Sequence, residues 1–105
     1  MIEIESLQEL CNNNAIRWSA HAMERLLLRG ISRNEIMQVI QAGEIIEQYP
    51  DDYPYPSCLI SGIALKDKYL HIVCGLGENT VFIITAYYPD KDKWESDFKT
   101  RKKGL

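Results

Sequence analysis

The chain has 105 residues, of which 46% are hydrophobic and 26% are charged, an ordinary composition for a single globular domain. Its formal charge of −3 argues against a protein that attracts nucleic acid over its whole surface. No apolar run approaches the roughly 18 residues that a membrane-spanning helix needs, so no membrane partner is expected.

The N-terminus, the cysteines and the histidines predict where the protein acts. The first residues, MIEIESLQEL, lack the basic and apolar regions of a secretory signal. Cys11, Cys58 and Cys74 are odd in number and far apart, so they suggest neither a disulfide framework nor a zinc site. The two histidines, His21 and His71, give only a weak metal pattern, so no metal and no cofactor are predicted. These features predict a cytoplasmic protein.

Charge is distributed unevenly along the chain. Residues 1–56 carry four arginines and nine acids, a balance of −5, and residues 57–88 balance at zero. Residues 89–105 carry six Lys or Arg residues against four acids, a balance of +2. This distribution leaves room for a local basic patch at the C-terminus.

Three helices are predicted in the first part of the chain, over residues 3–11, 20–29 and 33–42. Ser19 and Ser32 are the N-cap residues of the second and third helix, because a serine hydroxyl accepts a hydrogen bond from a free backbone N–H. Glu35 completes a capping box with Ser32. Gly30 and Gly43 follow these helices as stop signals.

Four strands are predicted after the helices, over residues 44–49, 57–65, 69–75 and 80–88. Tight turns over residues 66–68 and 77–79 favour an antiparallel meander. The predicted fold class is α+β, with the N-terminal helices packed on one face of a four-stranded antiparallel sheet. A short C-terminal helix is predicted within residues 92–102, and the stretch before Ser19 is expected to be short and extended.

Side-chain alternation along the last two strands predicts which residues share a face of the sheet. The face toward the helices is assigned Leu70, Ile72, Cys74, Phe82, Ile84 and Ala86. The opposite face is assigned Tyr69, His71, Val73, Val81, Ile83, Thr85 and Tyr87.

His71, Tyr87 and Arg101 are the predicted catalytic residues. A histidine, a phenol and an arginine can carry out acid–base chemistry on a phosphodiester. Arg101 lies one turn beyond Phe98 of the predicted final helix, where it would hold the phosphate. The alternative is that His71 packs with Tyr87 in a secondary core.

The stretch WSAHAMERLLLRGIS predicts a second surface. His21 and Arg25 lie on the arc of its helix opposite the apolar arc, with Arg29 at the border. These side chains are either an ordinary solvated face or an edge that contacts a phosphate or a partner. We predict the partner-binding role, with chemistry assigned to the face of His71.

Two further segments carry alternatives. Tyr53 and Tyr55 of PDDYPYP either stack on a base or pack over the sheet edge. In the C-terminal segment, Trp94 is a packing anchor or part of a binding surface. Lys102 and its basic neighbours form a solvated end or contact RNA phosphates.

Together these pieces resemble the small bacterial proteins grouped as domain of unknown function 4258. The resemblance covers residues 16–103 and rests on the stretches HAMERLLLRGIS, IIEQYPDDYPYPSCLISG, LHIVCG and TAYYPDKDKWESDFKTRKK. It implies a relationship to the RelE/ParE-like toxin superfamily, and so a RelE-like fold, RNA as a target and a cognate antitoxin as a partner. The positions that match the family pattern are His21, Arg25, Arg29, His71, Tyr87, Trp94 and Arg101.

Two functional hypotheses follow. The first is a toxin of the toxin–antitoxin type that acts as a metal-independent endoribonuclease. The alternative is a non-catalytic binding module that recognises a protein partner or a nucleic acid, which the acidic net charge favours.

Overall fold

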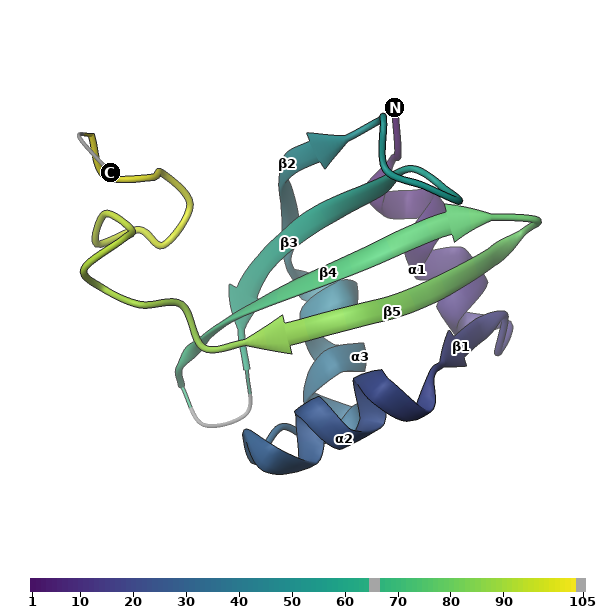
Figure 1. Ribbon diagram of the computed structural model, residues 1–105, viewed down its shortest axis with the longest axis horizontal. Helices are drawn as coiled ribbons and strands as arrows, with labels where there is room; N and C mark the ends of the chain where they lie inside the picture. Colours follow the sequence, from purple (N-terminus) through teal and green to yellow (C-terminus); the bar gives the residue numbers. More distant parts are fainter. Residues whose placement is uncertain (65–66, 104–105) are drawn as a thin grey trace.

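The computed structural model describes residues 1–64 and 67–103 of the chain (Figure 1). Its elements are α1 (Ile4–Asn12), β1 (Ile16–Trp18), α2 (Ala20–Leu28), α3 (Arg33–Ala42), β2 (Glu44–Tyr49), β3 (Ser57–Ile63), β4 (Tyr69–Gly77) and β5 (Thr80–Tyr87). The predicted α+β class and the three helices are confirmed. Leu65, the predicted end of the second strand, and Lys66, in the turn after it, lie outside the described residues.

The four predicted strands form an antiparallel meander, but the sheet has five strands in the order β1-β5-β4-β3-β2, so the predicted strand number is wrong. The additional strand is β1, which pairs parallel to β5 with Ile16 opposite Val81. The segment before Ser19 is extended, as expected, but its partner is about 65 residues away along the chain. A local pattern cannot reveal a pairing over that separation.

The helix boundaries follow the predicted signals. The Ser19 hydroxyl accepts a hydrogen bond from the Ala22 N–H at 3.0 Å, and Ser32 forms the capping box with Glu35. Gly43 follows α3 with extended backbone, and its lack of a side chain lets the chain pass close to neighbouring backbone atoms. A Cβ at this position would lie 2.5 Å from the Val39 carbonyl oxygen.

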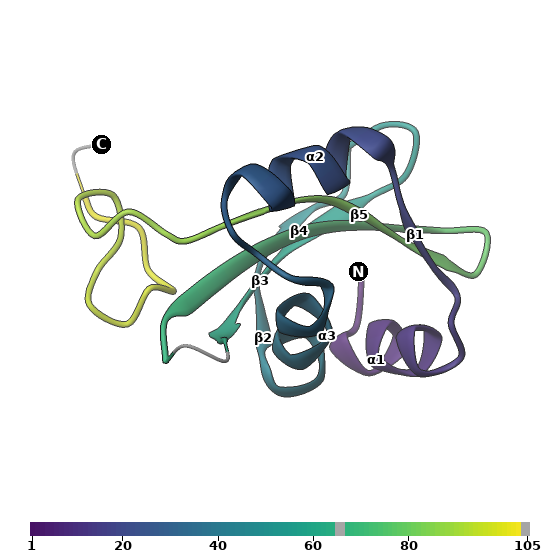
Figure 2. The same cartoon turned by 90° about the horizontal axis from the view of Figure 1, so that it is seen from below.

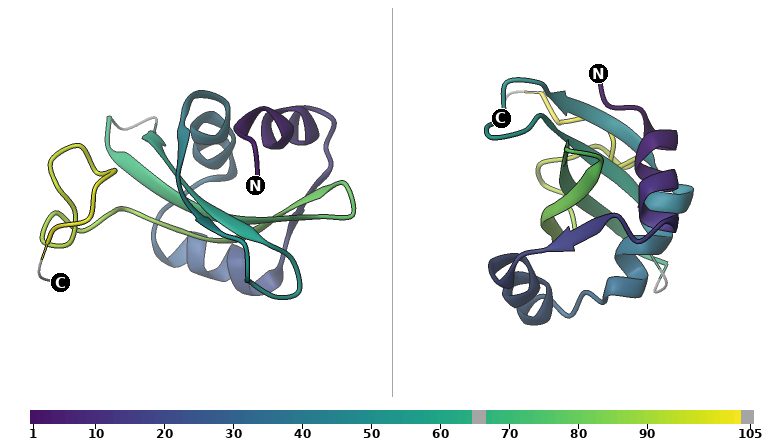
Figure 3. Two further views of the ribbon diagram at one scale, coloured as in Figure 1. Left: turned by 90° about the horizontal axis from the view of Figure 1, so that it is seen from above. Right: turned by 90° about the vertical axis from the view of Figure 1, so that its right-hand side faces the viewer.

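The helices do not all lie on one face, which corrects a second prediction. Figures 2 and 3 show α1 and α3 over one face of the sheet, whereas α2 lies along the edge where β1 ends. The core between the helices and the sheet includes Leu7, Leu26, Ile36, Val39, Ile40, Cys58, Ile60, Leu70, Ile72, Cys74, Val81 and Ile83. We call the opposite side of the sheet the outer face.

A β-bulge in β5 changes which side chains reach the outer face. Val73 pairs with Thr85 but the next residue, Cys74, pairs with Ile83, so Ile84 is an extra residue. The predicted alternation is therefore correct after the bulge and wrong before it. Val81 and Ile83 lie in the core, whereas Phe82 and Ile84 belong to the outer face.

Residues 89–103, which we call the strap, form turns and one isolated bridge between Trp94 and Arg101, not the predicted helix. The Asp97 carboxylate accepts hydrogen bonds from the backbone N–H groups of Lys99 and Thr100, at 2.9 and 3.1 Å. Phe98 has a φ of 53°, in the left-handed region. Local bonds of this kind compete with helical ones and fold the strap back on itself.

Candidate functional site

The strap is fastened to the outer face through one backbone carbonyl. The Phe98 oxygen lies 2.7 Å from His71 Nε2 and accepts a hydrogen bond from the Ser61 hydroxyl at 3.1 Å. The Phe98 ring also packs on Tyr69, with ring centroids 5.0 Å apart. Ser61 and His71 are cross-strand neighbours of β3 and β4, so the sheet register places both donors under the same carbonyl.

His71 is completely buried by this arrangement. Because a carbonyl can only accept, Nε2 carries the proton, and Nδ1 is left without a hydrogen-bond partner among the described residues. Burial lowers the pKa of His71; the bond to Phe98 and the charge of Glu47 act in the opposite direction, and the charge of Arg101 lowers it further. His71 is therefore neutral at neutral pH.

The predicted catalytic residues do come together around Trp94. Tyr87 is the cross-strand neighbour of His71, and their ring centroids are 5.4 Å apart. The Trp94 ring meets the His71 ring edge-on at 4.6 Å, and the Arg101 guanidinium carbon lies 4.5 Å from the Trp94 centroid. Burial raises the pKa of Tyr87, so its phenol also stays neutral.

The charge of Arg101 is already matched by a carboxylate. Its Nε and one terminal nitrogen donate to the two oxygens of Glu47, at 2.8 and 3.1 Å. These bonds lower the pKa of Glu47, and the Tyr49 hydroxyl donates to the same carboxylate. Lys102 is exposed, and its backbone N–H donates to the Lys93 carbonyl at 3.0 Å.

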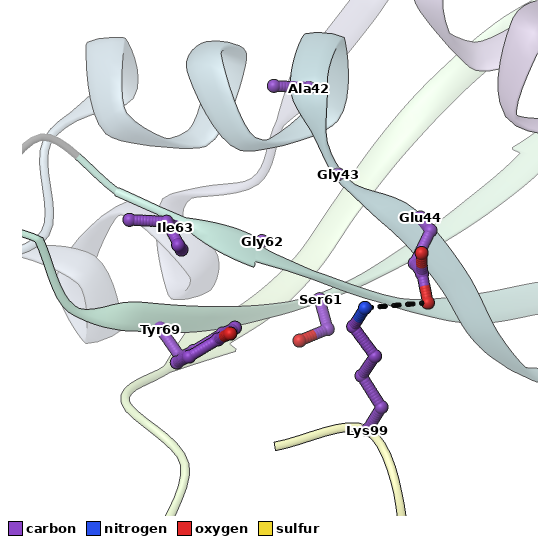
Figure 4. Close-up of a pocket in the computed structure, with 8 residues that line it drawn as sticks. All are labelled: Ala42, Gly43, Glu44, Ser61, Gly62, Ile63, Tyr69 and Lys99. Atoms are coloured by element: carbon purple, nitrogen blue, oxygen red, sulfur yellow. Dashed lines mark ion pairs between the residues drawn. The ribbon is translucent and has the colours of Figure 1, made fainter. Parts of the chain in front are cut away.

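A second ion pair fixes the strap beside the end of α3. Figure 4 shows Lys99 reaching Glu44 next to Ser61, with a Nζ–Oε1 distance of 3.2 Å. The surrounding pocket of about 300 Å³ also involves Gly43 and Tyr69. Its charged groups are paired with each other, so we assign the pocket to strap attachment.

His71 and Arg101 thus hold the strap in the described conformation, and Tyr87 packs beside His71. A phosphodiester would reach His71 only if the strap moved away, because the imidazole has no exposed surface. The three catalytic roles stay predictions, and Trp94 is placed as a buried anchor of the strap, 3% exposed.

The residues of α2 are presented differently. Arg29 donates to the Thr85 hydroxyl at 3.0 Å and to the Ala86 carbonyl at 2.8 Å, beyond the end of β1. Since successive helical residues turn by about 100°, Arg25 and His21 follow Arg29 at about 40° and 80° around the helix. Both are exposed, and neither makes a hydrogen bond or an ion pair within the described ranges 1–64 and 67–103. These two side chains are free to meet a ligand.

The edge that carries α2 is strongly cationic. All four arginines of residues 1–56 lie between positions 17 and 33, where Glu24 is the single acid. Arg17 is exposed and sits opposite Phe82 in the β1–β5 register, which directs it to the outer face. The sequence analysis missed Arg17 and Phe82. The clustering of arginines was a signal for the first, but the bulge concealed the second.

Aromatic side chains of the loop after β2 lie beside this edge. The Tyr55 ring stacks on Phe82 with centroids 5.2 Å apart and planes 13° apart, and its hydroxyl donates to Glu78 at 2.7 Å. Tyr53 is 95% exposed. Arginines next to stacked aromatic rings are typical of surfaces that contact single-stranded nucleic acids.

Three further observations concern metal sites, membrane spans and relatives. Within the described part of the chain, no group of His, Cys, Asp and Glu side chains is arranged to hold a metal, and no helix combines the length and apolar character needed to cross a bilayer. No curated protein and no solved structure matches the sequence. The model of the family described as a domain of unknown function, number 4258, matches residues 18–88, which excludes the whole strap that the resemblance had included. The chain therefore belongs to the domain of unknown function 4258 family.

Proposed function

We propose that the protein binds single-stranded RNA on the surface formed by α2, β1 and the outer face of β5. The observation that carries this proposal is the meeting of exposed arginines with a stacked aromatic pair. Arg17 lies opposite Phe82, on which Tyr55 stacks, and Arg25 is exposed on α2, which packs against β5.

The two kinds of side chain suit two parts of one ligand. An arginine guanidinium offers a planar set of donors that matches a phosphate, and Arg29 is already fixed at the same edge by Thr85 and Ala86. Aromatic faces accept unpaired bases of any sequence. The arginines of this edge also offset the acidic net charge locally, so the attraction of RNA phosphates is directed to this surface.

The second candidate is a RelE-like endoribonuclease of the toxin–antitoxin type, active in the cytoplasm and neutralised by an antitoxin. It is favoured by the exposed imidazole of His21, one helical turn from Arg25. His21 would take the proton of a ribose 2′-hydroxyl as its oxygen attacks phosphorus, and the 5′-oxygen would leave and take a proton from water. Arg25 would stabilise the charge on the phosphate. His71, Tyr87 and Arg101 would form an alternative centre only with the strap displaced.

The binding proposal is tested by the affinity for a fluorescein-labelled 12-nucleotide RNA, measured by anisotropy at several salt concentrations. Arg25→Ala is expected to weaken binding roughly 3–10-fold and to reduce the salt slope by about 0.7, the contribution of one phosphate contact on a single strand. Lys91→Ala, an exposed cation of the strap, is the matched control and is expected to change neither value. Equal losses in both variants would mean that only overall charge matters, and would contradict the proposed surface.

The catalytic candidate is tested by inducing the wild-type chain in a bacterial host and following growth together with RNA integrity. Cleavage that is lost in His21→Ala but retained in His71→Gln would place the chemistry on α2. The reverse pattern would place it under the strap. Normal growth and intact RNA, together with measurable RNA binding, would support the binding function and contradict the catalytic one.

A further inference from the structure

We propose that the small pocket under the loop after β2 is a slot for one unpaired nucleobase. The pocket is lined by Asp52, Tyr53, Pro54, Tyr55, Gly75, Phe82 and Ile84. This inference rests on the proposed RNA-binding function and adds to it the part of the ligand that enters the outer face.

The size and surface of the pocket suit a flat ring. Its volume is about 220 Å³, below the roughly 300–1,000 Å³ of clefts that enclose whole drug-sized ligands. Apart from Asp52, the pocket is lined by aromatic and aliphatic side chains and by Gly75, which has no side chain. Such a cavity rewards the burial of an aromatic face and gives a phosphate nothing to bind.

The aromatic wall is fixed before any ligand arrives. Tyr55 is held by its stack on Phe82 and by its hydroxyl bond to Glu78. Gly77 makes this position possible, because a Cβ there would lie 2.1 Å from the Tyr55 ring. A preformed wall loses little conformational entropy on binding, which favours a weak, small ligand such as one base.

Gly75 leaves the floor of the pocket empty. A Cβ at this position would lie 3.5 Å from the Pro56 carbonyl oxygen and 3.8 Å from Ile84 Cδ1, which are ordinary contact distances. The strand therefore tolerates a side chain here without backbone collision. A larger side chain at Gly75 would fill the space that the ligand is proposed to occupy.

Charge around the pocket orients the occupant. Asp52 accepts a hydrogen bond from the Ser57 hydroxyl, and its carboxylate repels a phosphate but can accept an N–H from a base edge. Arg17 lies opposite Phe82, a lining residue of the pocket, across the β1–β5 pairing. A nucleotide therefore fits with its base beside Asp52 and its phosphate toward Arg17.

The test compares two labelled 12-unit strands, an RNA of adenosines and a strand of the same length whose units lack bases. The full-length wild-type chain is expected to bind the adenosine strand about tenfold more tightly, since stacking adds to the phosphate contacts. Gly75→Val and Tyr53→Ala are each expected to bring this ratio close to one. The second variant alters a side chain that is 95% exposed, so it keeps the test valid if the first fails to fold.

Three other results are distinguishable. Equal wild-type affinity for both strands would overturn the base slot and leave phosphate binding by the arginines intact. A tenfold ratio that survives both substitutions would place the base contacts elsewhere and also overturn the slot. Binding of neither strand would overturn the proposed function and the slot together, and would point to a protein as the occupant of this surface.

Discussion

The two ends of the outer face carry similar side chains in opposite circumstances. Under the strap, His71 and Arg101 lie around Trp94; the Nε2 of His71 is bonded to the Phe98 carbonyl, and the charge of Arg101 is paired with Glu47. Along α2, His21 and Arg25 stand one turn apart and are exposed to solvent. Residue types alone made the strap end the better candidate for chemistry.

The difference teaches that availability, not composition, decides which groups can meet a ligand. Glu47 neutralises Arg101, and a backbone carbonyl occupies the only donor of His71. These contacts stabilise the fold, and they must be broken before either side chain can act. A ligand of the His21 and Arg25 side chains has no such competitor to displace among residues 1–64 and 67–103.

The largest expected effect is that of Trp94→Ala, which would disrupt the packing of the strap on the outer face. Trp94 is 3% exposed and contacts both the His71 ring and the Arg101 guanidinium. Its removal is expected to lower the free energy of unfolding by about 3–5 kcal/mol, measured by urea denaturation. A loss below about 1 kcal/mol would show that the strap is not an integral part of the fold.

A smaller effect is expected from pH. Because burial lowers the pKa of folded His71 below 6.5, the unfolded chain binds this proton more readily. The contribution of neutral His71 to the free energy of unfolding is fully present above pH 6.5 and is lost as the pH falls through the folded-state pKa. One proton limits the slope to about 1.4 kcal/mol per pH unit.

His71→Gln sharpens this pH test. Its amide can still donate to the Phe98 carbonyl but does not titrate. Urea denaturation between pH 7.5 and 5 is expected to give a flatter profile for the variant than for the wild type. Parallel profiles would exclude His71 as the origin of the slope.

Arg101→Ala is expected to cost about 1 kcal/mol of unfolding free energy, from a partly exposed ion pair and one cation–π contact. Added salt should reduce the difference from wild type, because ions screen exposed charges. Lys91→Ala serves as the control on the same segment. If Arg101→Ala is as stable as this control, the pair with Glu47 does not hold the strap.

The smallest effect on stability is expected from Arg25→Ala, within about 0.5 kcal/mol of the wild type. The comparison predicts that this variant loses RNA affinity without losing stability, and that Arg101→Ala does the reverse. Thermal denaturation and anisotropy on the same two preparations test both statements. A stability loss at Arg25 equal to that at Arg101 would remove the distinction between the two ends.

Local signals in the sequence predicted the helices well. Ser19, Ser32 and Glu35 act through bonds to residues three positions away, so their effect is visible in a short window. The adjacency of His71 and Tyr87 followed from the meander and is confirmed by their cross-strand pairing. The same local rules placed no signal at the bulge, which depends on how two strands match across the sheet.

The strap and the base slot depend on contacts between distant parts of the chain. Trp94, Phe98 and Arg101 are spaced for a helix, but their partners on β2 and β4 are found 23 residues or more away along the chain. Those partners, together with the Asp97 turn, favour a folded-back segment. Arg17 and Phe82 meet only through the parallel pairing of β1, so their shared surface could not be read from either segment alone.

The Phe98 carbonyl has a consequence for how such proteins vary. A peptide oxygen is the same for every amino acid, so the hydrogen bonds from His71 and Ser61 do not require a particular residue at position 98. Divergent chains of this architecture would keep the hydrogen-bond donors on the sheet, while the amino-acid sequence of the strap changes. The strap would then keep its position on the sheet even where its sequence can no longer be aligned.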